Sequence, residues 1–103
     1  MPYRIVWLRE VFQDLDEIRA YLTELSPLAS NRIMGEIATA LRGLAFMPEK
    51  NQRYLPAPEF NLRQKLVEDY IILYRIIKEK SLIEVIIVDH QSRDIPTYLQ
   101  DRL

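Results

Sequence analysis

The sequence predicts one α+β domain, in which a hairpin of two helices packs on a small, mainly antiparallel sheet of four strands. Three observations predict it. Apolar residues follow a helical spacing on both sides of a Ser26-Pro27 step, one β-type segment precedes this region, and three follow it. The predicted order is therefore β-α-α-β-β-β, with a short helix at the C-terminus. At 103 residues the chain is expected to form a single domain over residues 1–103.

The first strand and the first helix are predicted from a change of period near residue 9. Tyr3–Leu8 mixes β-branched and aromatic residues and is typical of a strand. From Glu10 on, the apolar residues recur every three or four positions, as on one face of a helix. This stripe consists of Val11, Leu15, Ile18, Leu22 and Leu25. The charged residues between them, Asp14 and Glu17 among them, are expected to face solvent.

A serine and a proline separate the first helix from the second. Serine is a favoured N-cap, and proline in the first helical turn loses no hydrogen bond. The second apolar stripe consists of Leu28, Ile33, Ile37, Leu41 and Leu44. Met47-Pro48 is expected to end this helix, because the residue before proline disfavours the α conformation. So short a connection predicts an antiparallel helical hairpin.

Three further strands are predicted in the second half of the chain. Residues 49–60 contain two prolines and no periodicity, and are expected to form a loop. Strands are predicted over Leu62–Val67, Tyr70–Ile77 and Leu82–Asp89, with short polar turns between them. A terminal helix is predicted from Ile95. The helical hairpin is expected to cover one face of the sheet and to leave the other face free for a partner.

Composition excludes several classes of protein. There is no cysteine and one histidine, so neither a disulfide nor a Cys/His metal site can form, and no metal or cofactor is expected. The formal net charge of −1 is unlike that of a typical nucleic-acid binder. Only residues 49–65 are locally basic, with four cations against two carboxylates. The longest apolar runs are too short to span a membrane, and the N-terminus lacks signal-peptide features, so a cytoplasmic location is expected.

Four motifs carry a family resemblance. They are D-L-x-x-I-x-x-Y at 14–21 followed by S-P-x-A at 26–29, L-x-x-x-P at 44–48, Y-I-I-L-Y-R-I at 70–76, and H-Q-S-R-D at 90–94. Their order and spacing together resemble the RelE/ParE superfamily of toxins. The resemblance implies the toxin of a type II toxin–antitoxin (plasmid stabilisation) system, which is neutralised by a cognate antitoxin. An exposed apolar groove beside the helices or across the sheet is expected to bind that antitoxin.

The resemblance leaves the target of the toxin open between two classes. RelE-like members cleave mRNA on the ribosome, whereas ParE-like members act on DNA gyrase. The ribonucleases carry an arginine directly after the strand tyrosine, but Ile71 follows Tyr70 here, and the arginine comes later, at Arg75. Isoleucine offers a phosphate neither charge nor hydrogen bond, so a ParE-like inhibitor of gyrase is favoured. A metal-independent endoribonuclease and a degenerate, non-toxic interaction module stay as alternatives.

The candidate site residues depend on which alternative holds. Ribonucleolysis without metal needs an acid, a base and cations around the phosphate. For a ribonuclease, the candidate catalytic residues are Arg63, Lys65, His90 and Arg93. The expected target-binding residues are Tyr74, Arg75 and Tyr98. Arg63 and Lys65 share one strand face by alternation, which also describes an ordinary solvated face. Whether the toxin forms a homodimer, or a heterotetramer with its antitoxin, is left open.

Overall fold

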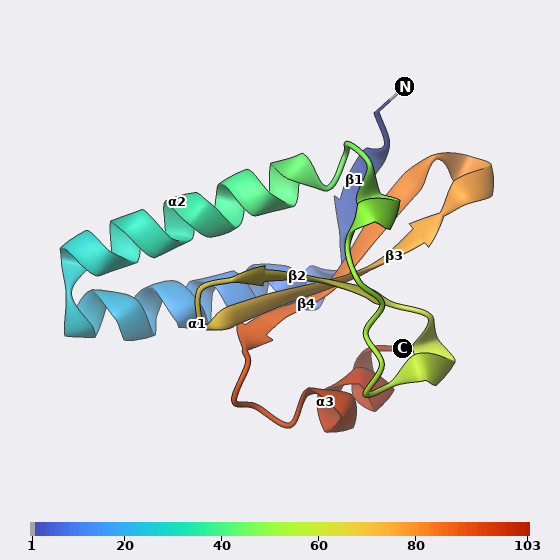
Figure 1. Ribbon diagram of the computed structural model, residues 1–103. Coiled ribbons are helices and arrows are strands. Elements are labelled where there is room, and N and C mark those ends of the chain that lie inside the picture. The colour runs from blue at the N-terminus through green and yellow to red at the C-terminus, as the bar shows by residue number, and fades with distance from the viewer. Residues whose placement is uncertain (1) are drawn as a thin grey trace.

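The computed structural model describes residues 2–103 and has the predicted α+β architecture. The seven main elements are β1 (Arg4–Trp7), α1 (Arg9–Leu25), α2 (Pro27–Gly43), β2 (Arg63–Val67), β3 (Tyr70–Ile77), β4 (Leu82–His90) and α3 (Ile95–Arg102). The strands form one sheet in the order β1-β4-β3-β2 (Figure 1). β1 is parallel to β4, and the other two pairings are antiparallel. Within the described part of the chain, no helix is long and apolar enough to cross a membrane.

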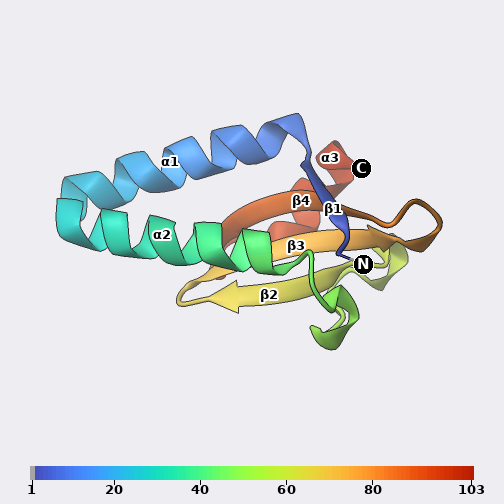
Figure 2. The ribbon, with the colours of Figure 1, turned by 90° about the horizontal axis from the view of Figure 1, so that it is seen from above.

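One residue ends the first helix and begins the second. The backbone N–H of Ser26 donates to the Leu22 carbonyl, and its Oγ accepts from the Ala29 N–H at 3.2 Å. Ser26 therefore satisfies backbone groups of both helices, with Pro27 in the first turn of α2. Seen from above, the two helices lie side by side, joined at one end (Figure 2). α1 packs mainly against β4, whereas α2 lies toward β2.

The second helix ends at Gly43, earlier than the predicted end at Met47-Pro48. After Gly43 the N–H groups of Leu44, Ala45 and Phe46 donate to carbonyls three residues back, which tightens the chain into a turn. Leu44 stays in the core at 2% exposure. Met47 then adopts a left-handed conformation with a φ of 50°, before Pro48. The helical spacing of apolar residues in the sequence continues past the end of α2, because Leu44 is buried although it lies in the turn. The helix was therefore predicted too long.

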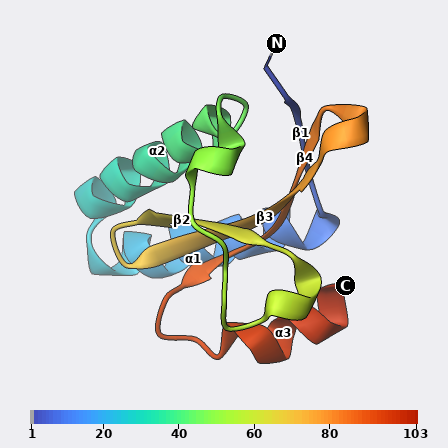
Figure 3. The same cartoon turned by 45° about the vertical axis from the view of Figure 1, so that its right-hand side comes forward.

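The face of the sheet away from the helical hairpin is covered, which corrects the expectation that it is free. α3 and the later part of the segment before β2, with the short 3₁₀ turn Pro58–Phe60, lie on this side (Figure 3). Ile95 and Leu99 from α3 and Tyr54 from the loop pack there against Leu73 and Ile87 of the sheet. β3 and β4 are apolar on both faces, which is the pattern of strands covered on both sides.

A bulge in β4 decides which residues face the helices. Leu73 pairs with Ile87, but Tyr74 pairs with Val85, so Ile86 has no partner in β3. The bulge shifts the alternation by one residue. Val88 consequently belongs to the cluster under the helices, and His90 lies opposite Tyr70.

Candidate functional site

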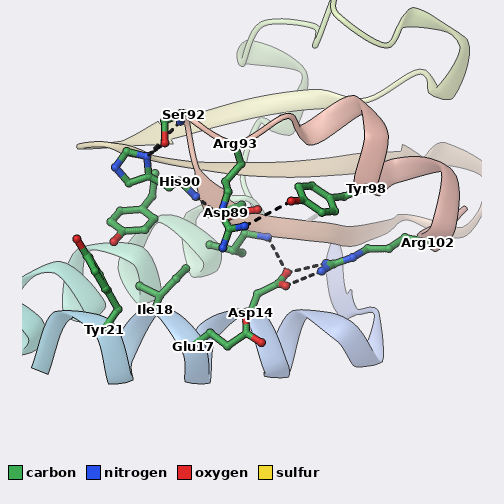
Figure 4. A pocket seen from close by; sticks show the side chains of 12 residues that line it. Asp14, Glu17, Ile18, Tyr21, Asp89, His90, Ser92, Arg93, Tyr98 and Arg102 are labelled. Carbon is green, nitrogen blue, oxygen red and sulfur yellow. Dashed lines mark hydrogen bonds and ion pairs between the residues drawn. The ribbon is translucent and has the colours of Figure 1, made fainter. Parts of the chain in front are cut away.

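A pocket of about 470 Å³ lies where β4 ends, between α1 and α3. The side chains that line it come from α1, from Tyr70 of β3 and from the continuous segment 88–102 (Figure 4). They include Asp14, Glu17 and Tyr21 from α1, His90 from β4, and Arg93 and Tyr98 from the C-terminal segment. The bulge in β4 contributes directly, because it places His90 on the helix side of the sheet.

The floor of the pocket is a buried ion pair between α1 and α3. Arg102 donates to both carboxylate oxygens of Asp14, at 2.6 and 2.5 Å, and to the Ile86 carbonyl at 3.0 Å. Asp14 also accepts from the Val88 N–H at 3.1 Å. β1 pairs with β4 only as far as Val85. Beyond that point Asp14 and Arg102 take the place of a neighbouring strand, because they bond the Val88 N–H and the Ile86 carbonyl. The hydrogen bond to Asp14 raises the pKa of Arg102 above its ordinary value.

The rim of the pocket carries Arg93, Tyr98 and His90. The Arg93 guanidinium lies 3.7 Å from the Asp89 carboxylate and donates to the Tyr98 hydroxyl at 3.4 Å. That hydrogen bond, together with the charge of Asp89, raises the pKa of Arg93. His90 Nδ1 lies 3.1 Å from the Ser92 backbone nitrogen and 2.7 Å from the Ser92 Oγ, so Nε2 is the ring nitrogen left to act toward a ligand. The imidazole meets Tyr70 edge-on.

The structure does not bring Arg63 and Lys65 to this pocket. Arg63 donates to the Asn51 carbonyl at 2.7 Å and to the Glu49 carbonyl at 3.2 Å, so it holds the loop before β2. Lys65 lies in a separate groove between α2 and β2. From strand spacing and register, roughly 12 Å of sheet separates Lys65 from His90. The four candidate catalytic residues therefore form two separate pairs.

Two of the expected target-binding residues are engaged within the protein. Tyr74 has no exposed surface, so in this fold its expected contact with a target is replaced by a structural role. Its hydroxyl donates to the Pro48 carbonyl at 2.6 Å and accepts from Asn51 at 2.9 Å. Arg75 pairs with Glu84 on the neighbouring strand, at 2.6 Å. Tyr98 alone of the three lies in the pocket, with 40% of its surface exposed.

Tyr74→Phe is expected to lower the free energy of unfolding by about 1–2 kcal/mol, because the buried Pro48 carbonyl loses its donor. Urea denaturation followed by circular dichroism measures the change. Tyr21→Phe is the matched control, since Tyr21 is 59% exposed and its hydroxyl makes no hydrogen bond to another of residues 2–103. Equal stability of the two variants would show that the Tyr74 hydroxyl does not anchor the loop.

Among the pocket residues that sequence reasoning missed are Asp14 and Arg102. Asp14 was expected on the solvent face of α1, and this is wrong, because Asp14 is only 9% exposed. A signal was present, since Asp14 lies three residues after Val11 and four before Ile18, on the apolar stripe itself. A carboxylate at such a position requires a cationic partner. Nothing in the sequence indicates that the partner is Arg102.

Comparisons with known proteins show the family of the chain. The family described as "ParE toxin of type II toxin-antitoxin system, parDE" matches residues 5–95. Toxin RelE2 of Caulobacter vibrioides is 30% identical over 91 residues, which are 87% of this chain and 97% of that toxin.

Similar solved structures come from the same kind of system. A chromosomal ParDE system from P. aeruginosa has a TM-score of 0.71 at 18% identity, over 85% of this chain and 95% of that one. The RelBE2 toxin–antitoxin complex from Mycobacterium tuberculosis has a TM-score of 0.67 at 22% identity, over 87% and 99%. A mutant of E. coli toxin RelE in the free state has a TM-score of 0.66 at 14% identity, over 99% and 94%. These likenesses confirm the predicted fold.

Proposed function

Because the chain belongs to the ParE toxin family of type II toxin–antitoxin systems, within the RelE/ParE superfamily, we propose that it stops growth by binding DNA gyrase. The family membership predicted from the motifs is confirmed. The proposal adds that the toxin acts in the cytoplasm, that a cognate antitoxin neutralises it, and that the pair stabilises the plasmid that carries it. The measured mass of the complex with the antitoxin distinguishes a heterotetramer from a smaller assembly.

The charge around the pocket is the observation that favours binding over catalysis. Three carboxylates, Asp14, Glu17 and Asp89, lie among its lining residues with two guanidiniums, those of Arg93 and Arg102. Both guanidiniums already face carboxylates, at 3.7 Å and 2.5 Å. A scissile phosphate gathers negative charge in its transition state and needs convergent cations. Arg63 and Lys65, the other candidate cations, lie outside this pocket.

We therefore assign the exposed rim of the pocket to target binding. Tyr98 and Arg93 lie next to each other there, with the guanidinium 6.0 Å from the centre of the phenol ring. Tyrosine and arginine are the residue types that dominate binding energy at protein interfaces. Arg75 lies outside the pocket and is paired with Glu84, but its side chain is 40% exposed. We assign it as a second cation that contacts the target.

Tyr98→Ala is expected to weaken inhibition of purified gyrase by about tenfold or more, because an aromatic anchor leaves the interface. A DNA supercoiling assay over a range of toxin concentrations measures it. Leu55→Ala is the control, since Leu55 is 72% exposed and lies outside the pocket. Failure of the wild-type chain to inhibit supercoiling or to stabilise gyrase-cleaved DNA contradicts the proposal.

The convergence of His90, Arg93 and Tyr98 in one pocket supports a second candidate, a ribosome-dependent mRNA endoribonuclease. In that case His90 Nε2 takes the proton of the ribose 2′-hydroxyl, whose oxygen attacks the phosphorus. The bond to the 5′-oxygen breaks, this oxygen takes a proton from water, and Arg93 faces the phosphate. Primer extension on translated mRNA tests this candidate. Cleavage that is lost in both His90→Ala and Arg93→Ala would support the nuclease, whereas absence of cleavage by the wild-type chain removes it.

A further inference from the structure

The part of the pocket that lies against α1 has aromatic and apolar walls. Glu17 and Tyr21 are four residues apart on α1, so they share one face of the helix, with Ile18 beside them. Across the pocket, Tyr70 meets the imidazole of His90 edge-on, with the ring centres 5.3 Å apart. Figure 4 shows Tyr21 and Ile18 pointing from α1 toward the end of β4, where His90 lies. A side chain that enters here therefore meets aromatic rings from two elements.

Tyr21 is the ring of the pocket whose surface is most open to a ligand. Tyr70 is only 5% exposed, and the Tyr98 ring already has the Arg93 guanidinium 6.0 Å from its centre. Tyr21 is 59% exposed, and none of the cations among residues 2–103 is stacked on its ring. The face of an aromatic ring attracts a positive charge, so the open ring of Tyr21 favours a cationic ligand.

One carboxylate of the pocket, that of Glu17, has no cationic partner in the described part of the chain. The other two carboxylates face the two guanidiniums of the pocket, at 2.5 and 3.7 Å. Glu17 accepts a hydrogen bond at 2.9 Å from the amide of Gln13, which is neutral. Its charge is the last among the effects that raise the pKa of Arg93, and no ion pair joins the two groups. The pocket therefore carries one negative charge in excess, one helical turn from the open ring.

The size of the pocket and its side chains indicate an organic cation. Its volume of about 470 Å³ lies within the range of about 300–1,000 Å³ that is typical of ligand pockets. Among residues 2–103, no group of three or more histidines and carboxylates is suited to hold a metal ion. Arginine fits better than lysine, because its planar guanidinium stacks on an aromatic ring and donates two parallel hydrogen bonds to a carboxylate.

We infer that this part of the pocket binds an arginine side chain presented by the protein that the toxin inhibits. The guanidinium stacks on the ring of Tyr21 and donates to the carboxylate of Glu17. The inference rests on the proposed binding of gyrase and specifies the chemistry of one contact. It also extends the binding surface from Arg93 and Tyr98 on the rim across the pocket to α1.

Glu17→Lys tests the charge in the supercoiling assay with purified gyrase. We expect the toxin concentration that halves supercoiling to rise about tenfold or more, because the arginine then meets a like charge. Glu24→Lys is the matched control, since Glu24 is exposed on the same helix, lies outside the pocket and undergoes the same change of charge. Its effect should stay below about twofold, and the difference between the variants should shrink as salt is raised. Thermal unfolding of both variants shows that the fold is retained.

Two substitutions of Tyr21 separate its ring from its hydroxyl. Tyr21→Ala removes the ring and is expected to weaken inhibition about fivefold, which is the effect of losing one cation–π contact. Tyr21→Phe keeps the ring and should inhibit as the wild-type chain does. Equal inhibition by the alanine and phenylalanine variants would overturn the stacking on Tyr21.

A small probe tests the pocket without gyrase. N-acetylarginine methylamide carries the guanidinium, and the corresponding citrulline derivative has the same shape without the charge. In a titration of the wild-type chain followed by NMR, the arginine derivative is expected to shift the amide signals of Glu17 and Tyr21. The citrulline derivative should bind at least about tenfold more weakly, because it has no charge to offer Glu17.

The outcomes separate the inference from the proposed function. If the wild-type chain inhibits gyrase, and Glu17→Lys and Glu24→Lys inhibit equally well, the arginine contact is overturned and gyrase binding stands. If the two probes bind equally, or neither shifts these signals, the preference of the pocket for a guanidinium is overturned. If the wild-type chain does not inhibit gyrase but the arginine derivative binds as expected, the proposed target falls, and the preference of the pocket for a guanidinium stands.

Discussion

Asp14→Asn is expected to lower the free energy of unfolding by about 3–5 kcal/mol, because it leaves the Arg102 guanidinium buried without its charge partner. The two side chains are only 10% and 16% exposed, so solvent screens their interaction little. Asp14 also satisfies the Val88 N–H at the edge of β4, and an amide cannot serve this group and both guanidinium nitrogens. One substitution therefore weakens the contacts among α1, β4 and α3.

The measurement is urea denaturation, with Glu17→Gln as the control. Glu17 lies one turn further along α1 and is exposed. Glu17→Gln removes the same charge, so the free energy of unfolding should change by no more than about 0.5 kcal/mol. The double variant Asp14→Asn with Arg102→Met should recover part of the loss, since no charge is then left unpaired. If Asp14→Asn is as stable as Glu17→Gln, the ion pair does not hold α3.

Expression of the chain alone is expected to abolish colony formation, and co-expression of the antitoxin is expected to restore it. With a Kd near 1 nM and free antitoxin near 1 μM, only about 0.1% of the toxin stays unbound. Colony counts after induction, with and without the adjacent open reading frame, measure the effect.

Normal growth of cells that contain the folded chain would contradict toxicity. That result would support the degenerate interaction module, which is the third alternative from the sequence. An immunoblot of the soluble fraction is required beside the colony counts, since a chain that is degraded also permits growth.

Local sequence patterns predicted the elements well. The predicted bounds of β3, Tyr70–Ile77, agree with the structure, because polar turns flank an apolar run on both sides. Ser26-Pro27 marked the hairpin because capping and proline chemistry act within one turn of the chain. β4 differed from its prediction by one residue, and α2 was predicted too long.

The candidate site depends on contacts that no local pattern contains. Asp14 and Arg102 are 88 positions apart, and only the docking of α3 brings them together. The bulge at Ile86 arises from the register between two strands, and it decides that His90 faces α1. The coverage of the far face by α3 also depends on tertiary packing. Sequence therefore indicated His90, Arg93 and Tyr98 as candidates, but not the carboxylates that surround them.

Pulse labelling of DNA and protein synthesis after induction tests the central claim most directly. If the toxin acts by binding gyrase, incorporation of labelled thymidine should fall first, while incorporation of labelled amino acids continues. The antitoxin should prevent the fall. Early loss of amino-acid incorporation with DNA synthesis intact would contradict the account, because the ribosome and not gyrase would then be the target.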